Sequence, residues 1–224
     1  MHSRISIAHL GLIAALYCGP ISSQEATPLS FSGGVLGGFS ATQVHGDATA
    51  GFNKLGLDAG VFVDVRDPGE FWGVRIEMRY IQKGSRKPHN PDAGDYTTWT
   101  RKLDYVELPV MIDVNLGRYQ VGGGLYGGWL LRAEKIDSGV AFDVRDEFRS
   151  WDIGGLWYGR VHISDHAFVQ MRMSGSILSI RDTDGIVGGL FRQRMRNIVA
   201  QLGLGWDFGG SDGSRGGGGA AFSL

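Results

Sequence analysis

The sequence predicts an all-β protein, an eight-stranded antiparallel up-and-down transmembrane β-barrel. Eight stretches of the chain alternate apolar and polar residues with a period of two, the period at which side chains of a β-strand change face. The connections between these stretches are alternately short and long, as are the turns and loops of outer-membrane barrels. The chain also contains 37 glycines, which destabilise helices but let strands bend and pack closely.

The chain begins with the pattern of an export signal. Arg4 precedes an apolar run over residues 5–17, and a Gly-Pro pair and small residues follow. The run is shorter than the roughly 20 apolar residues that a spanning helix needs. We therefore predict a signal peptide over residues 1–23, cleaved near Ser23. Cys18 is the only cysteine of the sequence. A lipid attached to Cys18 is the alternative, although the large tyrosine before it fits that motif poorly.

Residues 72–83 show the strand pattern most clearly, with Ile81 as the exception. The apolar and charged faces are Trp72, Val74, Ile76, Met78 and Tyr80 against Arg75, Glu77, Arg79 and Lys83. A helix would spread these charges around its circumference. Pro109 lacks a backbone N–H, so we expect it at a bulge or a poorly paired point. In chain order, the predicted strands span residues 30–44, 55–66, 72–83, 102–115, 118–134, 150–163, 167–181 and 194–208.

The connections indicate how the barrel lies in the membrane. The short ones are residues 67–70, 116–117 and 164–166, and the long ones are residues 45–54, 84–99, 135–149 and 182–193. Short turns of bacterial barrels are periplasmic and long loops are extracellular, which predicts both ends of the mature chain in the periplasm. Aromatic residues near both ends of the strands predict two interfacial girdles: Phe71, Trp72, Tyr119, Trp206 and Phe208 on the periplasmic side, and Tyr80, Trp129 and Trp151 on the extracellular side.

The polar strand faces then have to fill a narrow lumen, because an eight-stranded barrel is just wide enough for its own side chains. Buried charges are costly unless they are paired. We therefore predict a lumen ion-pair network with a structural role; a narrow conduit, or a proton-sensitive or catalytic cluster, is the alternative. Its predicted members are Asp58, Asp64, Arg75, Glu77, Arg79, Glu107, Asp113, Arg132, Asp152, Arg160 and Arg172.

Composition and motifs argue against other classes of function. With 22 Lys+Arg against 23 Asp+Glu, the net charge of -1 gives no basic excess for nucleic acid. Ser174, His162 and Asp152 contain the residue types of a hydrolase triad, but their spacing does not favour one. We expect no enzyme activity, no cofactor and no metal site. Residues 24–208 are the predicted barrel domain, and residues 209–224 a glycine-rich flexible tail.

Four fragments resemble the PorT-like outer-membrane β-barrel family. They are GFNKLGLDAG at residues 51–60, YIQKG at 80–84, LDYVELP at 103–109 and GGGLYGG at 122–128. The resemblance implies an eight-stranded barrel, and one branch of the family supports protein secretion and gliding in type IX systems. The last predicted strand also resembles the insertion signal read by the barrel-assembly machinery, through Gln201, Gly203, Trp206 and Phe208.

These features predict a protein of the Gram-negative outer membrane. Its expected partners are outer-membrane lipid, the barrel-assembly machinery during insertion, and a secretion-system or extracellular protein bound by loops 84–99 and 135–149. A narrow channel or transporter is the main alternative. Two further alternatives are a soluble periplasmic barrel with its apolar face inward, and an outer-membrane lipid-modifying or proteolytic enzyme.

Overall fold

The computed structural model describes residues 29–45, 51–89, 97–137, 139–181 and 195–209. The predicted signal peptide and all but the first residue of the predicted tail lie outside them. The strands are β1 (Ser30–His45), β2 (Lys54–Arg66), β3 (Trp72–Lys87), β4 (Trp99–Leu116), β5 (Tyr119–Asp137), β6 (Val140–Asp143), β7 (Trp151–His162), β8 (Ala167–Ser176) and β9 (Arg196–Asp207).

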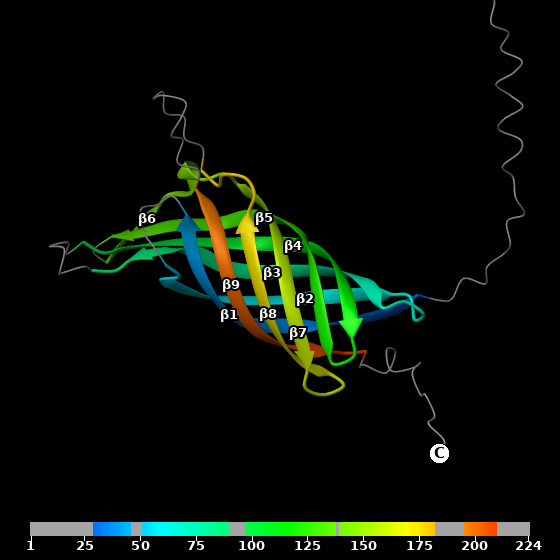
Figure 1. The fold of residues 1–224 in the computed structure, drawn as a ribbon. Coiled ribbons are helices and arrows are strands. Elements are labelled where there is room, and N and C mark those ends of the chain that lie inside the picture. Colours follow the sequence, from blue (N-terminus) through cyan, green and yellow to red (C-terminus); the bar gives the residue numbers. More distant parts are fainter. Residues whose placement is uncertain (1–28, 46–50, 90–96, 138, 182–194, 210–224) are drawn as a thin grey trace, which may run out of the picture.

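The strands form one antiparallel sheet that closes on itself (Figure 1). Its order is β4-β3-β2-β1-β9-β8-β7-β5, and β5 pairs with β4 to complete the ring. The four-residue β6 extends the sheet at the far end of β5, where Asp137 faces Val140. The predicted eight-stranded antiparallel barrel is therefore confirmed, with β6 as an addition outside the ring.

Several strand ends differ from the prediction. β3 and β4 continue into the connection predicted over residues 84–99, where Lys87 pairs with Trp99. The connection predicted over residues 135–149 contains β6 and a 3-10 helix at Arg145–Glu147. Cross-strand hydrogen bonds can continue beyond the bilayer, where the side-chain alternation imposed by lipid and lumen is no longer required. Sequence alternation therefore marks the membrane-spanning part of a strand better than its end.

Pro109 lies at a gap in the sheet, as predicted. β3 and β4 pair at Ile76–Val110 and again at Arg79–Glu107 in the same register, and no pair is formed between them at Leu108 and Pro109. Proline has no N–H to donate to the ladder. The strand therefore tolerates Pro109 by leaving these two positions unpaired with β3, while both still pair with β5 and the register is unchanged.

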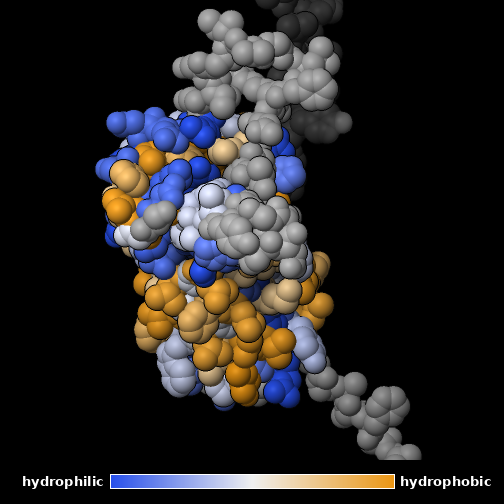
Figure 2. All heavy atoms as spheres, turned by 90° about the vertical axis from the view of Figure 1, so that its left-hand side faces the viewer, coloured by the Kyte–Doolittle hydropathy of each residue, from blue (hydrophilic) through white to orange (hydrophobic). Residues whose placement is uncertain are grey.

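The outer surface carries the apolar strand faces. Leu108 and Val110 of β4 are about half exposed, so they point away from the barrel axis. Figure 2 shows hydrophobic residues gathered around the lower part of the molecule in that view, with hydrophilic residues above them. The aromatic residues predicted for the two girdles are also exposed on this surface. This arrangement contradicts the soluble alternative, which required the apolar face to point inward.

Glycines let large rings inside the lumen lie directly against the barrel wall. A Cβ placed on Gly205 would lie 2.0 Å from the Phe168 ring, and one on Gly154 would lie 2.4 Å from the Tyr126 ring. Side chains at these positions would displace the rings. The high glycine content thus has a packing role at these points of the wall.

Candidate functional site: the lumen and its two ends

The centre of the lumen is organised around Glu77 of β3. Its Oε1 accepts a hydrogen bond from Arg75 Nε at 2.6 Å, and its Oε2 accepts from Arg172 Nη2 at 2.6 Å and Arg79 Nη1 at 3.2 Å. Arg172 belongs to β8, which lies opposite β3 in the closed ring. One carboxylate therefore joins three guanidinium groups and bridges the two sides of the barrel.

Further charge pairs flank Glu77. Arg79 reaches Asp58 at 2.8 Å, and Arg75 reaches Asp64 at 2.9 Å. Toward the long-loop end, Lys83 binds Glu107 at 2.6 Å and Asp152 of β7 at 2.9 Å. Each of these four pairs joins two different strands, so the charges connect the barrel wall from inside.

A second buried carboxylate, Asp113, lies nearer the short-turn end. Its Oδ1 accepts hydrogen bonds from Arg66 at 2.6 Å and Gln120 at 2.7 Å, and its Oδ2 accepts from the Tyr158 hydroxyl at 2.8 Å. The charged side chains joined in these pairs are named the lumen network below. They are six cations and six anions: Arg66, Arg75, Arg79, Lys83, Arg160 and Arg172 against Asp58, Asp64, Glu77, Glu107, Asp113 and Asp152.

Aromatic rings complete the surroundings of the cations. The Arg75 guanidinium carbon lies 3.7 Å from the centre of the Phe62 ring, and that of Arg160 lies 3.9 Å from the Phe168 ring. Lys83 Nζ lies 4.6 Å from the Tyr126 ring. Ring faces attract cations most strongly where water is excluded. The network is therefore a packed, charge-neutral filling, with aromatic groups between its ion pairs.

Ten of the eleven side chains predicted for the network point into the lumen, but the position predicted for Arg132 was wrong. In the β4–β5 ladder, Tyr105 pairs with Leu130 and Asp104 with Arg132, so Leu131 is an extra residue. One extra residue turns all following side chains to the opposite face. Arg132 consequently lies outside, 56% exposed, and pairs with Glu134.

Sequence reasoning missed two charged members of the network. Lys83 had been placed on the polar face of its strand, and it binds two carboxylates in the lumen. Arg66 lies on the inward side at the end of β2 and binds Asp113. The tyrosines at 105, 126 and 158 were missed as well, although Tyr105 lies on the same strand face as Glu107, and Tyr158 on the same face as Asp152 and Arg160. Parity with those neighbours was the signal that could have found them.

The long-loop end of the lumen is closed by apolar side chains. Two of them, Phe148 and Ile180, come from connecting segments, and their backbones are joined through the Arg149 N–H, which donates to the Ile180 carbonyl at 2.9 Å. Ile81, the exception in its strand pattern, belongs to the same group. The set, called the extracellular cluster below, is Val44, Ile81, Leu103, Tyr105, Leu130, Ala133, Phe148, Ile180 and Val199.

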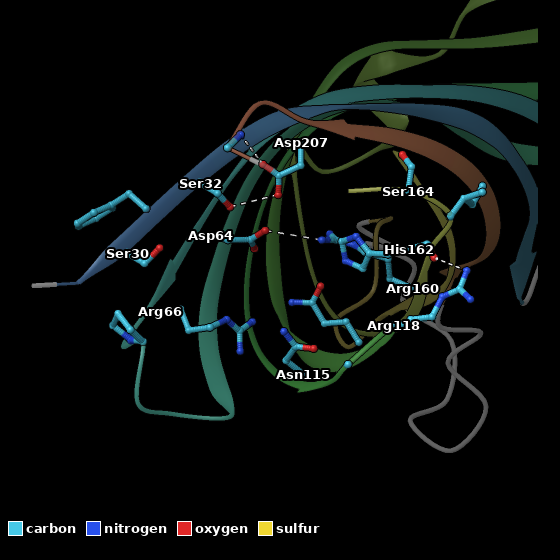
Figure 3. A pocket seen from close by; sticks show the side chains of 16 residues that line it. Ser30, Ser32, Asp64, Arg66, Asn115, Arg118, Arg160, His162, Ser164 and Asp207 are labelled. Atoms are coloured by element: carbon cyan, nitrogen blue, oxygen red, sulfur yellow. Dashed lines mark hydrogen bonds and ion pairs between the residues drawn. The ribbon is translucent and has the colours of Figure 1, made fainter. Parts of the chain in front are cut away.

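The short-turn end instead opens into a polar cavity of about 340 Å³. Figure 3 shows Arg66 and Arg118 on opposite sides of this cavity, with Arg160 and His162 between them in that view. Asp64 and Asp207 also line it. A void of only about 10 Å³ lies deeper in the lumen. Within the described residues, open space of ligand size is thus found at this end of the barrel.

The predicted insertion-signal residues divide between the two faces of β9. The Gln201 amide points inward and donates to Asp58 at 2.8 Å, whereas Trp206 and Phe208 are exposed on the outer surface. Gly203 lies between them in the strand and faces Gly38 of β1. The His166 ring stacks on Trp206 at a centroid distance of 5.3 Å. The outward aromatics are available to lipid or to another protein, and their recognition during insertion stays a prediction.

The geometry does not bring a hydrolase triad together. His162 pairs with Phe168, six residues along β8 from Ser174, a separation of roughly 20 Å at about 3.3 Å per residue. Asp152 is held by Lys83 and Asn197 near the other end of the lumen. Among the described residues, no group of three or more His, Cys, Asp or Glu side chains is placed to hold a metal ion. No helix in the same part of the chain is long and apolar enough to span a membrane.

Comparisons with solved structures find three outer-membrane or surface proteins that are similar to this chain. In solved structures the chain is similar to Ail, the attachment invasion locus protein of Yersinia pestis, in complex with the heparin analogue sucrose octasulfate, at 10% identity and a TM-score of 0.47, covering 80% of this chain and 99% of that one. It is also similar to Neisserial surface protein A, at 10% identity and a TM-score of 0.48, covering 80% and 98%. OprG of Pseudomonas aeruginosa matches at 12% identity and a TM-score of 0.33, covering 80% and 95%.

The family assignment comes from the sequence. No curated protein matches this chain. Residues 22–181 match the family described as the outer membrane protein beta-barrel domain, which is more than half of the chain. The chain therefore belongs to the outer membrane protein beta-barrel domain family and is a small β-barrel of the Gram-negative outer membrane.

Proposed function

We propose that this protein is a plugged outer-membrane barrel that binds a partner protein outside the cell and does not conduct solutes. The observation that carries the proposal is the filling of the lumen. Twelve paired charges occupy its length, and the extracellular cluster covers its long-loop end. An ion crossing the barrel would have to break buried pairs, each costly to separate. The barrel then serves as a rigid support for the strands and loops that extend outside the cell.

The proposed binding surface is the sheet that extends beyond the barrel. At its far end, Lys87 pairs with Trp99, Trp99 with Asp137, and Asp137 with Val140, so β3, β4, β5 and β6 lie side by side. Val140 and Phe142 of β6 are both more than half exposed. Exposed apolar side chains on a rigid scaffold are suited to partner binding. The resemblance to PorT-like barrels supports a partner from a protein-secretion or gliding assembly.

The test is a Val140→Ser/Phe142→Ser double variant in the native bacterium. The variant is expected to reduce cargo secretion into the medium as strongly as gene deletion, while the barrel keeps its heat-modifiable mobility on gels. Leu116→Ser is the matched control, because Leu116 is also exposed but lies at a short turn. Secretion unchanged in both the double variant and the deletion strain would overturn the secretion role.

A narrow channel is the second candidate, and the cavity of about 340 Å³ at the short-turn end favours it. Current through the purified barrel in a planar bilayer separates the two functions. The plugged barrel is expected to give no sustained current at moderate voltage. A steady, voltage-independent current would favour the channel.

A further inference from the structure

The cavity at the short-turn end, called the periplasmic cavity below, contains hydrogen-bond donors that have few or no acceptors. Arg160 is 2% exposed, and its Nε has no hydrogen-bond partner among the described residues. Besides its stacking on the Phe168 ring, its two polar contacts are long, at 3.3 Å to Gln170 and 3.6 Å to Asp64. His162 Nδ1, which carries a hydrogen in one of the two neutral tautomers, is likewise buried and without a partner within the described part of the chain. The Arg118 guanidinium on the rim makes one hydrogen bond to the described residues, 3.5 Å long, to the His162 carbonyl.

The carboxylates of the same cavity are already engaged. Both oxygens of Asp64 accept hydrogen bonds from Arg75, at 2.9 and 3.2 Å. The Asp207 oxygens accept from the Ser32 hydroxyl at 3.3 Å and from the Gly209 N–H at 2.9 Å. Each carboxylate oxygen of the cavity thus already accepts a hydrogen bond, whereas Arg160 Nε has no acceptor among the described residues. A group that completes the site must itself be an acceptor.

The guanidinium groups of the lining indicate that this acceptor is anionic. Three arginines, Arg66, Arg118 and Arg160, line the cavity together with two carboxylates, Asp64 and Asp207. The Arg66 charge is neutralised by Asp113 below the cavity, and Asp64 is shared with Arg75. Asp207, a nearby carboxylate, is bound to the neutral donors of Ser32 and Gly209. Arg118 and Arg160 remain, and their guanidinium donors are the ones still available to a ligand. Guanidinium groups bind carboxylate and phosphate oxygens strongly because their donors match these anions in charge and geometry.

We infer that the periplasmic mouth of the barrel is a binding site for an oxyanion, a carboxylate or a phosphate, held by Arg118, Arg160 and His162. The cavity of about 340 Å³ lies at the small end of the range for small-molecule sites. Phe31 and Ile163 also line it, so it accommodates an anionic group attached to a small organic body. The ligand enters from the periplasm, because short turns of bacterial barrels lie on that side.

The inference is tested by calorimetric titration of the detergent-solubilised full barrel in phosphate-free buffer. The probes are inorganic phosphate, N-acetylleucine, and the amide of N-acetylleucine as an uncharged control. Saturable binding of phosphate or of N-acetylleucine is expected, with no binding of the amide. The anion that binds more tightly shows whether the natural ligand carries a phosphate or a carboxylate. Arg118→Gln is expected to weaken that binding roughly 10-fold, the size of one charge-assisted hydrogen bond. Arg118 is exposed on the rim, so its replacement leaves the fold intact.

The matched control is Arg132→Gln, which removes an exposed arginine at the other end of the barrel and is expected to leave anion affinity unchanged. Absence of binding by both anions would overturn the inference. Equal weakening by Arg118→Gln and Arg132→Gln would also overturn it, because it would mean diffuse attraction to surface charge. The Val140→Ser/Phe142→Ser variant is expected to bind the anion normally, so failure of the partner-binding proposal is seen separately.

Discussion

The two ends of the barrel are closed differently, and the length of the connections explains the difference. At the extracellular end, Phe148 and Ile180 from the connecting segments pack with inward strand residues in an apolar cluster. At the periplasmic end, β4 and β5 are joined by only two residues after Leu116, and the mouth remains a polar cavity. Short turns have no residues that can fold over the lumen, whereas long connections supply apolar side chains that do.

The largest loss of stability is expected from changes to the lumen network, in the middle of the barrel between these two ends. Glu77→Ala leaves Arg75, Arg79 and Arg172 without the carboxylate they share. Breaking a buried pair in this way is expected to lower the free energy of unfolding by about 3–5 kcal/mol. Urea unfolding of the barrel refolded into lipid vesicles, followed by tryptophan fluorescence, measures it. Glu77→Gln keeps a hydrogen-bond acceptor, so its free energy of unfolding should fall by less than that of Glu77→Ala. Wild-type stability in Glu77→Ala would contradict the pairing.

A smaller effect is expected at the extracellular end. Phe148→Ala removes a 7% exposed ring from the extracellular cluster, and the expected loss is about 3 kcal/mol, the low end for a buried phenylalanine. Phe142→Ala is the matched control, since Phe142 is 52% exposed and its replacement should change stability by about 0.5 kcal/mol or less. Equal losses for the two variants would argue against the apolar closure.

A smaller loss of stability is expected from removing a single hydrogen bond between the lumen network and the periplasmic cavity. Tyr158→Phe removes the hydroxyl that donates to Asp113 Oδ2 at 2.8 Å. Asp113 keeps Arg66 and Gln120 as partners, so a loss of about 1–2 kcal/mol is expected in the same urea titration. A loss of stability as great as that of Glu77→Ala would contradict this expectation, because it would mean that the Asp113 hydrogen bonds contribute as much as those of Glu77.

The smallest effect is expected at the periplasmic mouth. Ser32→Ala removes a 3.3 Å hydrogen bond to Asp207, and water in the cavity can replace it. The expected change in stability is about 0.5 kcal/mol or less. A loss matching that of Tyr158→Phe would mean that this mouth is closed to water, which would remove the contrast between the two ends.

The period-two alternation was sufficient to predict the barrel and the inward face of most strands. It failed at Arg132 because the single extra residue, Leu131, reverses the faces without a distinctive sequence signal. It also gave no reason for apolar Ile81 and Leu103 to point inward, because their partners Phe148 and Ile180 come from connecting segments. Contacts between residues that are distant in the sequence cannot be predicted from the local alternation of apolar and polar residues.

The periplasmic cavity was beyond sequence reasoning for a related reason. Its lining comes from the start of β1, the end of β2, the β4–β5 turn and the ends of β7 and β9. Arg118 was only the first residue of a predicted strand, and no ligand-binding role was predicted from the sequence for Arg118 or, outside the triad and metal sites that were rejected, for His162. These residues become neighbours only when β4 pairs with β5 and the ring closes.

Accessibility of engineered thiols tests the central claim, a filled lumen with one open mouth, most directly. In a Cys18→Ala background, Ser32→Cys places a thiol in the periplasmic cavity, and Ser174→Cys places one inside the lumen, where Ser174 is 7% exposed. A charged, membrane-impermeant thiol reagent is added to each barrel in lipid nanodiscs, where both ends face water. The cavity thiol is expected to react at least about 100-fold faster, because the lumen thiol must wait for local opening. Similar rates at the two positions would show that water and ions fill the lumen, and would contradict the account.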